Sequence, residues 1–342
     1  MEAFNNATKI NPKSADAWGY KGVILANQSK YNDALEAFNN ATKINPKSAD
    51  AWYLKAYVLN RLGRTTDAAT AFATSLYETG MFFLSQGKYD EALQAFTKST
   101  EIDPNSADAW CYKGNALFDI GNYDEALQTL TKSTEINPNS DNAWFLKGLI
   151  LANQSKYDEA LEAFNRAIEI NPKSDNAWCY KGITLVYQKK YDEALEAFNR
   201  AIEINRFSTG PWSCKSVALT GLGRSTEAEE AFAIFECNSG RVLLCKRDYE
   251  NALTALINKS LEIDPKFADA WCLKGVALFD LGRYKEALQA CDKAIELNRF
   301  DGLAWKIKAN SLKALGRTAE ADPALAMAED LGDQEQNYGC SP

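Results

Sequence analysis

The chain has 342 residues, a net charge of −8 and no histidine. The excess of negative charge argues against nucleic acid as a partner, because binding to phosphates needs basic patches. No apolar run approaches the roughly 18 residues that span a bilayer, and zinc sites of the usual spacing are excluded because they need histidine or paired cysteines. We therefore expect protein or peptide partners and no cofactor.

One stretch of 34 residues, Asp141 to Ser174, recurs along the whole chain. We number its positions 1 to 34: Trp stands at position 4, Gly at 8, Tyr at 17, Ala at 20, Phe at 24, Ala at 27 and Pro at 32. A period of 34 with these residue types is typical of a helix–turn–helix repeat. The pattern resembles the tetratricopeptide repeat family. The resemblance implies an all-α solenoid, a right-handed superhelix whose first helices line the concave face.

The chain opens with half a repeat, because Glu2–Trp18 recurs word for word at Glu36–Trp52. Two explanations stay open: a shortened chain, or an end that another subunit completes. Ten full repeats follow, and they begin at Ala15, Ala49, Ala73, Ala107, Asp141, Asp175, Thr209, Ala233, Ala268 and Gly302.

In each repeat we predict helix A over positions 1–14 and helix B over positions 15–28. Serine at position 34 is a good N-cap for the next helix A, and these serines are Ser14, Ser48, Ser106, Ser140, Ser174 and Ser208. Asn-Pro or Asp-Pro at positions 31 and 32 ends helix B, because the residue before proline avoids helical angles.

All eight tryptophans stand at position 4. We interpret them as scaffold rather than as a ligand platform, with each ring filling the space beside the small residues at positions 8 and 20. Lysine stands at position 7 in eight repeats. Its stem is expected to cover apolar surface while its ammonium group meets Glu36, Glu162 or Glu196 at position 22; the alternative is a stripe for an acidic partner.

Two repeats stop short, at Phe72 and Phe232, so that positions 25–34 are missing and the next repeat begins at once. These two and the last repeat carry Gly-Arg at positions 15 and 16, and we name the three closing repeats. They predict three arrays, residues 1–72, 73–232 and 233–332, followed by a polar tail, 333–342. Arginine replaces proline just before the second and third closing repeats, in the pairs Arg206-Phe207 and Arg299-Phe300.

At each short repeat, helix B can run straight into the next helix A, or the chain can break near Thr79-Gly80 and near Asn238-Ser239-Gly240. Both alternatives stay open, and the Asn-Ser-Gly sequence favours a break at the second junction. A one-residue insertion after Ala252 predicts a local bulge in helix B.

Peptides bound by the family lie along helix A and touch positions 2, 5, 9 and 12, and sometimes 13. Here position 2 is mostly acidic or amide, position 5 is aromatic or cysteine, and positions 9 and 12 are largely apolar. We predict an apolar groove with an acidic rim; the alternative is that stacking buries these positions. The candidate groove residues are Asp50, Tyr53, Tyr57, Tyr77, Met81, Asp108, Asn115, Asn142, Phe145, Asn176, Ile183, Arg241, Lys306 and Asn310.

The family's carboxylate clamp uses Lys and Asn at positions 5 and 9, and this chain does not match it. The corresponding residues of the first two repeats are Gly19, Val23, Tyr53 and Tyr57. A chaperone-adaptor function is therefore not expected.

The eight cysteines form no CxxC pair, and four recur at position 5. We expect most of them to be reduced small hydrophobes, which together with the lack of a signal-like segment favours a cytoplasmic protein. An extracellular or cell-surface location is the alternative, and there Asn6, Asn27, Asn40, Asn153 and Asn258 would be glycosylation sites.

Three functional hypotheses follow, and none is catalytic for this chain alone, because no nucleophile–base pair or phosphate loop stands out. The first is an interaction scaffold that binds a partner segment in the groove. The second is a structural protein that self-assembles through its ends or faces into filaments or oligomers. The third is the targeting half of a larger enzyme.

Overall fold

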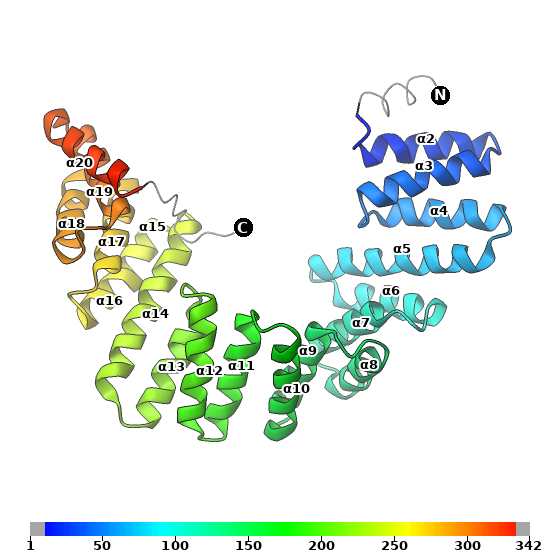
Figure 1. Ribbon diagram of the computed structural model, residues 1–342, viewed down its shortest axis with the longest axis horizontal. Helices are drawn as coiled ribbons and strands as arrows, with labels where there is room; N and C mark the ends of the chain where they lie inside the picture. Colours follow the sequence, from blue (N-terminus) through cyan, green and yellow to red (C-terminus); the bar gives the residue numbers. More distant parts are fainter. Residues whose placement is uncertain (1–10, 333–342) are drawn as a thin grey trace. The chain divides into compact units, whose positions relative to one another are not determined.

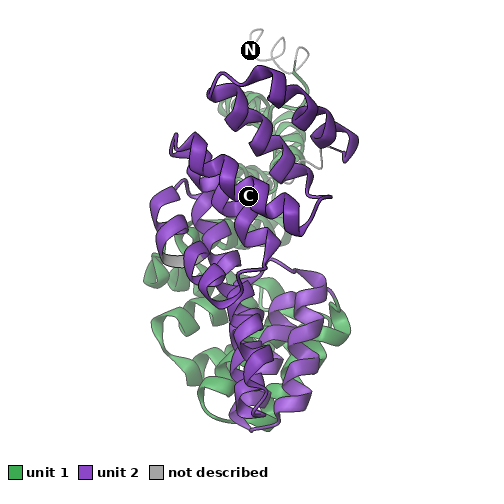
Figure 2. Ribbon diagram, turned by 90° about the vertical axis from the view of Figure 1, so that its left-hand side faces the viewer, with its two compact units in different colours: residues 1–172 green, residues 173–342 purple. Residues whose placement is uncertain are grey.

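A computed structural model describes residues 11–332, apart from the side chains of residues 255 and 256. Every regular element in this range is a helix, which confirms the predicted all-α class. The chain forms two compact units, residues 1–172 and 173–342 (Figure 2). The division into three arrays stays a prediction, and the half repeat at residues 2–10 and the tail at 333–342 lie outside the described residues.

In unit 1 the helices follow one another as the A and B helices of successive repeats (Figure 1). Each A helix packs against the B helix that follows it, and from α4 onward also against the B helix before it. The helices are α2 (Ala15–Asn27), α3 (Tyr31–Ile44), α4 (Ala49–Arg61), α5 (Thr65–Ser85), α6 (Tyr89–Ile102), α7 (Ala107–Ile120), α8 (Tyr123–Ile136), α9 (Asp141–Asn153) and α10 (Tyr157–Ile170).

Unit 2 repeats this arrangement, with one interrupted B helix made of three short pieces. Its elements are α11 (Asp175–Tyr187), α12 (Tyr191–Ile204), α13 (Thr209–Gly221), α14 (Ser225–Cys245), α15 (Tyr249–Asn251), the π-helix η1 (Ala252–Ile257), α16 (Asn258–Ile263), α17 (Ala268–Asp280), α18 (Tyr284–Leu297), α19 (Gly302–Ala314) and α20 (Thr318–Asp330). Within the described residues, no helix is both long and apolar enough to cross a membrane.

The predicted serine caps form at five of six A helices. In each of the five, the serine hydroxyl accepts a hydrogen bond from the backbone N–H three residues later, as Ser14 does from Ala17 at 3.3 Å. The prediction is wrong at Ser208, whose side chain makes no cap bond. The residue three positions later is Pro211, which has no N–H to donate.

The core lies where helices A and B cross at position 8. A Cβ atom added to Gly148 would lie 2.6 Å from Cε1 of Phe164, and the same holds at Gly182 for Phe198, at 2.5 Å. These phenylalanines, at position 24, are fully buried. The space beside position 8 is therefore filled by the position-24 ring, and our assignment of that role to tryptophan is wrong.

Both short repeats are followed by one continuous helix. Each of α5 and α14 has 21 residues and serves as helix B of one repeat and helix A of the next. The break that we favoured at Asn238-Ser239-Gly240 is therefore wrong. Gly240 stands at position 8 of its repeat, and an added Cβ would meet Ile257 Cγ1 at 2.8 Å. It is glycine because a neighbouring helix approaches closely, not because the chain turns.

The predicted bulge after Ala252 is confirmed, because the inserted residue is absorbed in η1. Beyond it the register of the repeat is restored. Ser260 Oγ donates to the carbonyl of Ala233 at 2.8 Å, across one residue more than the equivalent bond from Ser99 to Ala73. A π-turn thus places the end of helix B where an uninterrupted α-helix would place it.

Most cysteines are free thiols, in agreement with the sequence prediction. The free thiols are Cys111, Cys179, Cys214, Cys237, Cys272 and Cys291. Cys245 is disulfide-bonded, and Cys340 lies outside the described residues. Burial raises the pKa of the Cys111 thiol to about 12, so this group stays protonated and unreactive at neutral pH.

Candidate functional site

The tryptophans at position 4 are half-buried and held by two contacts that recur along the chain. The indole N–H of Trp52 donates to the carbonyl of Pro46 at 2.7 Å, and equivalent bonds hold six further rings. The position-7 lysine lies over the ring in all eight repeats that carry the pair, with Nζ 4.5 to 5.3 Å from the ring centroid. Both contacts lie within the scaffold, as we predicted for tryptophan.

The lysine ammonium groups lie over the indole rings, a contact that we did not predict. The expected position-22 carboxylates Glu162 and Glu196 also act on Lys147 and Lys181. Lys308 Nζ also reaches Asp292 Oδ1 at 2.6 Å, at position 25 of the preceding repeat. Burial lowers the pKa of Lys147, although Glu135 and Glu162 partly offset this effect. The position-7 lysines are therefore partly buried and contribute to the packing of the repeats.

The candidate groove residues of unit 1 fall into two groups. Tyr53 and Tyr57 of α4 are exposed, at 55% and 49% of their surface, and Asp50, Asp108 and Asn142 are exposed as well. A second group is half-buried, namely Tyr77, Met81, Asn115 and Phe145. Of these, Tyr77, Met81 and Phe145 pack into the cores between helices. Among the candidate groove residues of unit 1, the exposed aromatic side chains thus lie on α4, whereas Tyr20 of α2 and Phe82 of α5 are exposed outside the candidate positions.

Unit 1 has a pocket of about 220 Å³ where α5, the end of α6 and the start of α7 meet. We name it the acidic pocket; it is lined by Ala73, Thr74, Tyr77, Glu78, Ser99, Asp103, Ser106 and Asp108. Burial raises the pKa of Tyr77, and the neighbouring carboxylates raise it further. Burial also raises the pKa of Glu78. The pocket combines an aromatic ring with three carboxyl groups.

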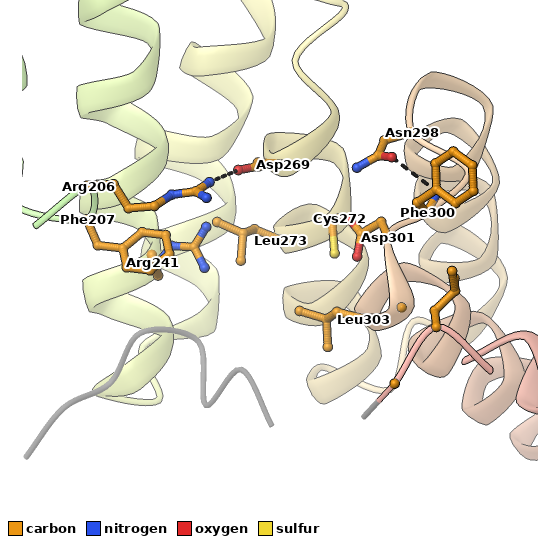
Figure 3. A pocket seen from close by; sticks show the side chains of 13 residues that line it. Arg206, Phe207, Arg241, Asp269, Cys272, Leu273, Asn298, Phe300, Asp301 and Leu303 are labelled. Atoms are coloured by element: carbon orange, nitrogen blue, oxygen red, sulfur yellow. Dashed lines mark hydrogen bonds and ion pairs between the residues drawn. The ribbon is translucent and has the colours of Figure 1, made fainter. Parts of the chain in front are cut away.

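Unit 2 has a pocket of about 250 Å³, which we name the Arg-Phe pocket. Figure 3 shows Arg206, Phe207 and Arg241 at one end and Asn298 and Phe300 at the other. The full lining is Arg206, Phe207, Arg241, Asp269, Cys272, Leu273, Asn298, Phe300, Asp301, Gly302, Leu303, Leu331 and Gly332.

Two guanidinium groups meet at one ring in the Arg-Phe pocket. The Cζ atom of Arg206 lies 4.9 Å and that of Arg241 4.5 Å from the centroid of Phe207. Arg206 also pairs with Asp269 at 3.3 Å, on the exposed side (Figure 3). Burial raises the pKa of the Cys272 thiol well above its usual range, so this lining residue is neutral.

The two pockets occupy the same place in their repeats. In the acidic pocket, positions 2, 5, 6, 31 and 34 are Thr74, Tyr77, Glu78, Asp103 and Ser106. In the Arg-Phe pocket they are Asp269, Cys272, Leu273, Asn298 and Asp301, with Arg206 and Arg241 added from neighbouring repeats. Equivalent positions of two repeats therefore form both pockets. The pocket of unit 1 has three carboxyl groups, whereas the pocket of unit 2 has two guanidinium groups and two carboxyl groups.

Arg241 was predicted as a candidate groove residue, and the structure places it in the Arg-Phe pocket, only 7% exposed. Arg206, Phe207 and Phe300 were not selected from the sequence. The sequence feature that marks these residues is the pair Arg-Phe at positions 32 and 33, where other repeats have proline at position 32. The two turns that carry it are far apart in the sequence, and both line this pocket because the repeats of unit 2 stack.

The other selected residues do not line either pocket. Asn176 is exposed, whereas Ile183, Lys306 and Asn310 are half-buried on A helices of unit 2. Of the sequons, Asn27 and Asn153 are exposed, Asn40 and Asn258 are half-buried, and Asn6 lies outside the described residues. Glycosylation stays a prediction.

Family models described as tetratricopeptide repeat match the chain at residues 3–36, 24–82, 83–150, 142–174, 176–207 and 268–301. A search of curated proteins found no significant match.

Solved structures with a similar chain include MamA protein and YrrB. MamA is 23% identical over 57% of this chain and 93% of its own, with a TM-score of 0.45. MamA from Desulfovibrio magneticus RS-1 is 20% identical over 48% and 92%, with a TM-score of 0.45. YrrB, described as a tetratricopeptide repeat protein with an unusual peptide-binding site, is 24% identical over 60% and 93%, with a TM-score of 0.35. The family assignment rests on the repeat models.

Proposed function

Because the chain belongs to the tetratricopeptide repeat family, a family of protein-interaction scaffolds, we propose that it holds a segment of a partner protein along its A helices without catalysing a reaction. The partner is a protein rather than a nucleic acid, since the net charge of −8 repels phosphates. The binding residues are those of the A helices that stacking leaves open.

The observation that carries this proposal is the pair of exposed tyrosines on α4. Tyr53 and Tyr57 are four residues apart and therefore lie on one face of the helix. Each leaves about half of its surface in water, and the ring of Tyr53 meets that of Phe72 edge-on, with centroids 6.0 Å apart. Rigid aromatic groups with a polar tip are typical anchors of protein interfaces.

The test is a substitution of Tyr57 by glutamate. Peptides are first selected from a displayed random library on the purified full chain, and the best of them is synthesised for fluorescence anisotropy. Loss of an anchoring tyrosine is expected to cost about 2 kcal/mol, or roughly 30-fold in Kd. Tyr89→Glu is the matched control, because Tyr89 is also an exposed tyrosine of unit 1 but stands at position 17, at the start of the B helix α6.

An unchanged Kd for Tyr57→Glu, with an unchanged circular dichroism spectrum, would contradict the proposal that the partner segment binds at α4. Phe145 is unsuitable for the same test, because its ring lies 6.0 Å from that of Phe164 and packs against the core. A charge at that position would disturb folding and binding together.

Self-assembly is the second candidate function, and it is favoured by an exposed Arg-Phe turn in unit 2 and the acidic pocket in unit 1. Phe300 is 71% exposed, and the guanidinium of Arg299 lies 5.6 Å from its ring centroid. This cationic, apolar turn complements the acidic pocket of a second copy. Light scattering should then give a mass that rises with concentration for the natural chain but not for Arg299→Glu. A constant 37.9 kDa at every concentration would contradict it.

A further inference from the structure

Unit 2 holds two free thiols in direct contact with each other. Cys179 stands at position 5 of α11, and Cys214 stands at position 6 of α13, the A helix of the next repeat. Their side chains are hydrogen-bonded, thiol to thiol. Because α11 and α13 pack directly against each other, this contact joins the A helices of two neighbouring repeats.

The packing of the repeats does not need a cysteine at position 6. Cys111 and Cys237 also stand at position 5, and each shares a core cluster with a leucine at position 6 of the following repeat, Leu146 for the first and Leu273 for the second. An aliphatic side chain therefore satisfies the packing there. The thiol of Cys214 adds a chemical property that the fold does not require.

The thiol pair is also less covered than the cysteine of an equivalent repeat. At Cys111, the amide of Asn142 at position 2 of the next repeat donates to Sγ at 3.5 Å. At Cys179 the same position is Gly210, an exposed residue whose added Cβ would lie 3.6 Å from Sγ. Cys179 is 7% exposed against 2% for Cys111, and Cys214 is half-buried. A small molecule can therefore reach the pair beside Gly210.

The hydrogen bond makes the two sulfurs chemically unequal. The bond to Cys214 raises the pKa of the Cys179 thiol, and burial raises it further. The same bond lowers the pKa of Cys214, although burial opposes this effect. Cys179 therefore keeps its proton and donates it toward the sulfur of Cys214. Since the thiolate is the nucleophile in exchange with disulfides, Cys214 is the sulfur that attacks first.

We propose that Cys179 and Cys214 are a site of reversible oxidation, at which a low-molecular-weight disulfide converts the two thiols into a disulfide bond between α11 and α13. The inference goes beyond the proposed scaffold function and does not depend on it. It assigns a covalent modification to a pair of side chains that the repeat architecture alone does not explain.

The reaction takes two exchange steps. In the first, the Cys214 thiolate attacks one sulfur of the small disulfide, so that a mixed disulfide forms at Cys214 and one small thiolate leaves. In the second, Cys179 gives up its proton and attacks the Cys214 sulfur, which releases the other small thiolate. Two protein thiols are oxidised, one small disulfide is reduced to two thiols, and the two protein protons pass to these products. Because the fold holds the sulfurs in contact, the second step is intramolecular and fast.

The first test uses the full natural chain and glutathione. The chain is reduced, equilibrated with a series of ratios of oxidised to reduced glutathione, and alkylated to trap the remaining thiols. Trypsin then releases Cys179 in the peptide 174–181 and Cys214 in the peptide 207–215. Mass spectrometry should find these two peptides joined, at a ratio at which Cys111 carries no glutathione. The same treatment in urea is the control, because the contact is absent from the unfolded chain.

Three single substitutions then separate the roles of the two sulfurs. Cys179→Ser should leave a lasting mixed disulfide with glutathione at Cys214, because the second thiol is gone. Cys214→Ser should leave Cys179 unmodified, because that thiol is nearly buried and keeps its proton. Cys111→Ser is the matched control, since it removes a buried thiol at position 5 and should leave the bond between Cys179 and Cys214 intact. Circular dichroism spectra show whether each variant is folded.

The disulfide should also change the exchange of amide hydrogens in unit 2. It removes conformations in which α11 and α13 separate, so amides of α11, α12 and α13 should exchange at least roughly tenfold more slowly in the oxidised chain. The equally oxidised Cys214→Ser chain is the reference, because its other cysteines have met the same glutathione. Amides of α2 to α4 in unit 1 should not differ between the two.

Three outcomes overturn the inference. The first is that no ratio of glutathione joins the two peptides in the folded chain. The second is that they join no more readily in the folded chain than in urea, and the third is that Cys179→Ser and Cys214→Ser react alike with glutathione. The scaffold proposal is judged separately, by the binding of library peptides to Tyr57→Glu.

Discussion

Replacing Thr74 with proline is expected to lower the free energy of unfolding by about 3 kcal/mol or more. Thr74 stands near the middle of α5, which runs without a break from Thr65 to Ser85. Proline there removes the N–H that the helix uses and forces its ring against the carbonyl of Thr70. The break would fall between the half of α5 that belongs to the closing repeat and the half that lines the acidic pocket.

The same substitution at Thr65 is the control, because Thr65 is the first residue of α5. Its N–H has no partner within the helix, and proline is favoured at that position. Chemical denaturation of both variants gives the two free energies, and hydrogen exchange shows whether amides on both sides of residue 74 lose protection. Similar stability of the two variants would contradict a continuous α5 and favour the broken junction.

Much of the fold follows from local rules that a sequence states directly. The A and B helices, five serine caps and the bulge after Ala252 depend on neighbours within a few residues, and all were predictable. Even the failed cap at Ser208 was visible, because Pro211 stands where the donor should be. The 34-residue period then fixes which helices pack together.

The errors arose where one residue type has two physical roles. Gly240 was interpreted as a breaker, yet glycine at position 8 is there because Ile257 approaches to within 2.8 Å of its missing Cβ. The Arg-Phe pocket could not be predicted for a different reason. It is lined by the turns at Arg206 and Phe300. The distance between these turns depends on how the repeats of unit 2 stack, which the sequence does not give. The sequence places Tyr57 on the groove side of helix A but does not predict that its ring is exposed. Phe145 is also an aromatic candidate on helix A, yet its ring packs against the core.

The position-24 ring provides the second large effect. Phe164→Ala is expected to cost about 3–5 kcal/mol of unfolding free energy, because a fully buried phenylalanine leaves a cavity when it is truncated. The cavity cannot close easily, since Gly148 on the facing helix has no side chain to move into it. Hydrogen exchange should lose protection first in α9 and α10, the pair that this ring joins.

Phe72 is the matched control, because it also stands at position 24 but in a closing repeat. Position 8 of that repeat is Ala56 instead of glycine, and 37% of the surface of Phe72 is exposed. Burial energy scales with the apolar area removed from water, so Phe72→Ala should cost roughly half as much or less. Equal losses of unfolding free energy for the two substitutions would mean that glycine at position 8 does not increase the burial of the position-24 ring. A large difference would place a strong link at the glycine–phenylalanine contact of the repeats that have one, namely those of Gly22, Gly80, Gly148 and Gly182.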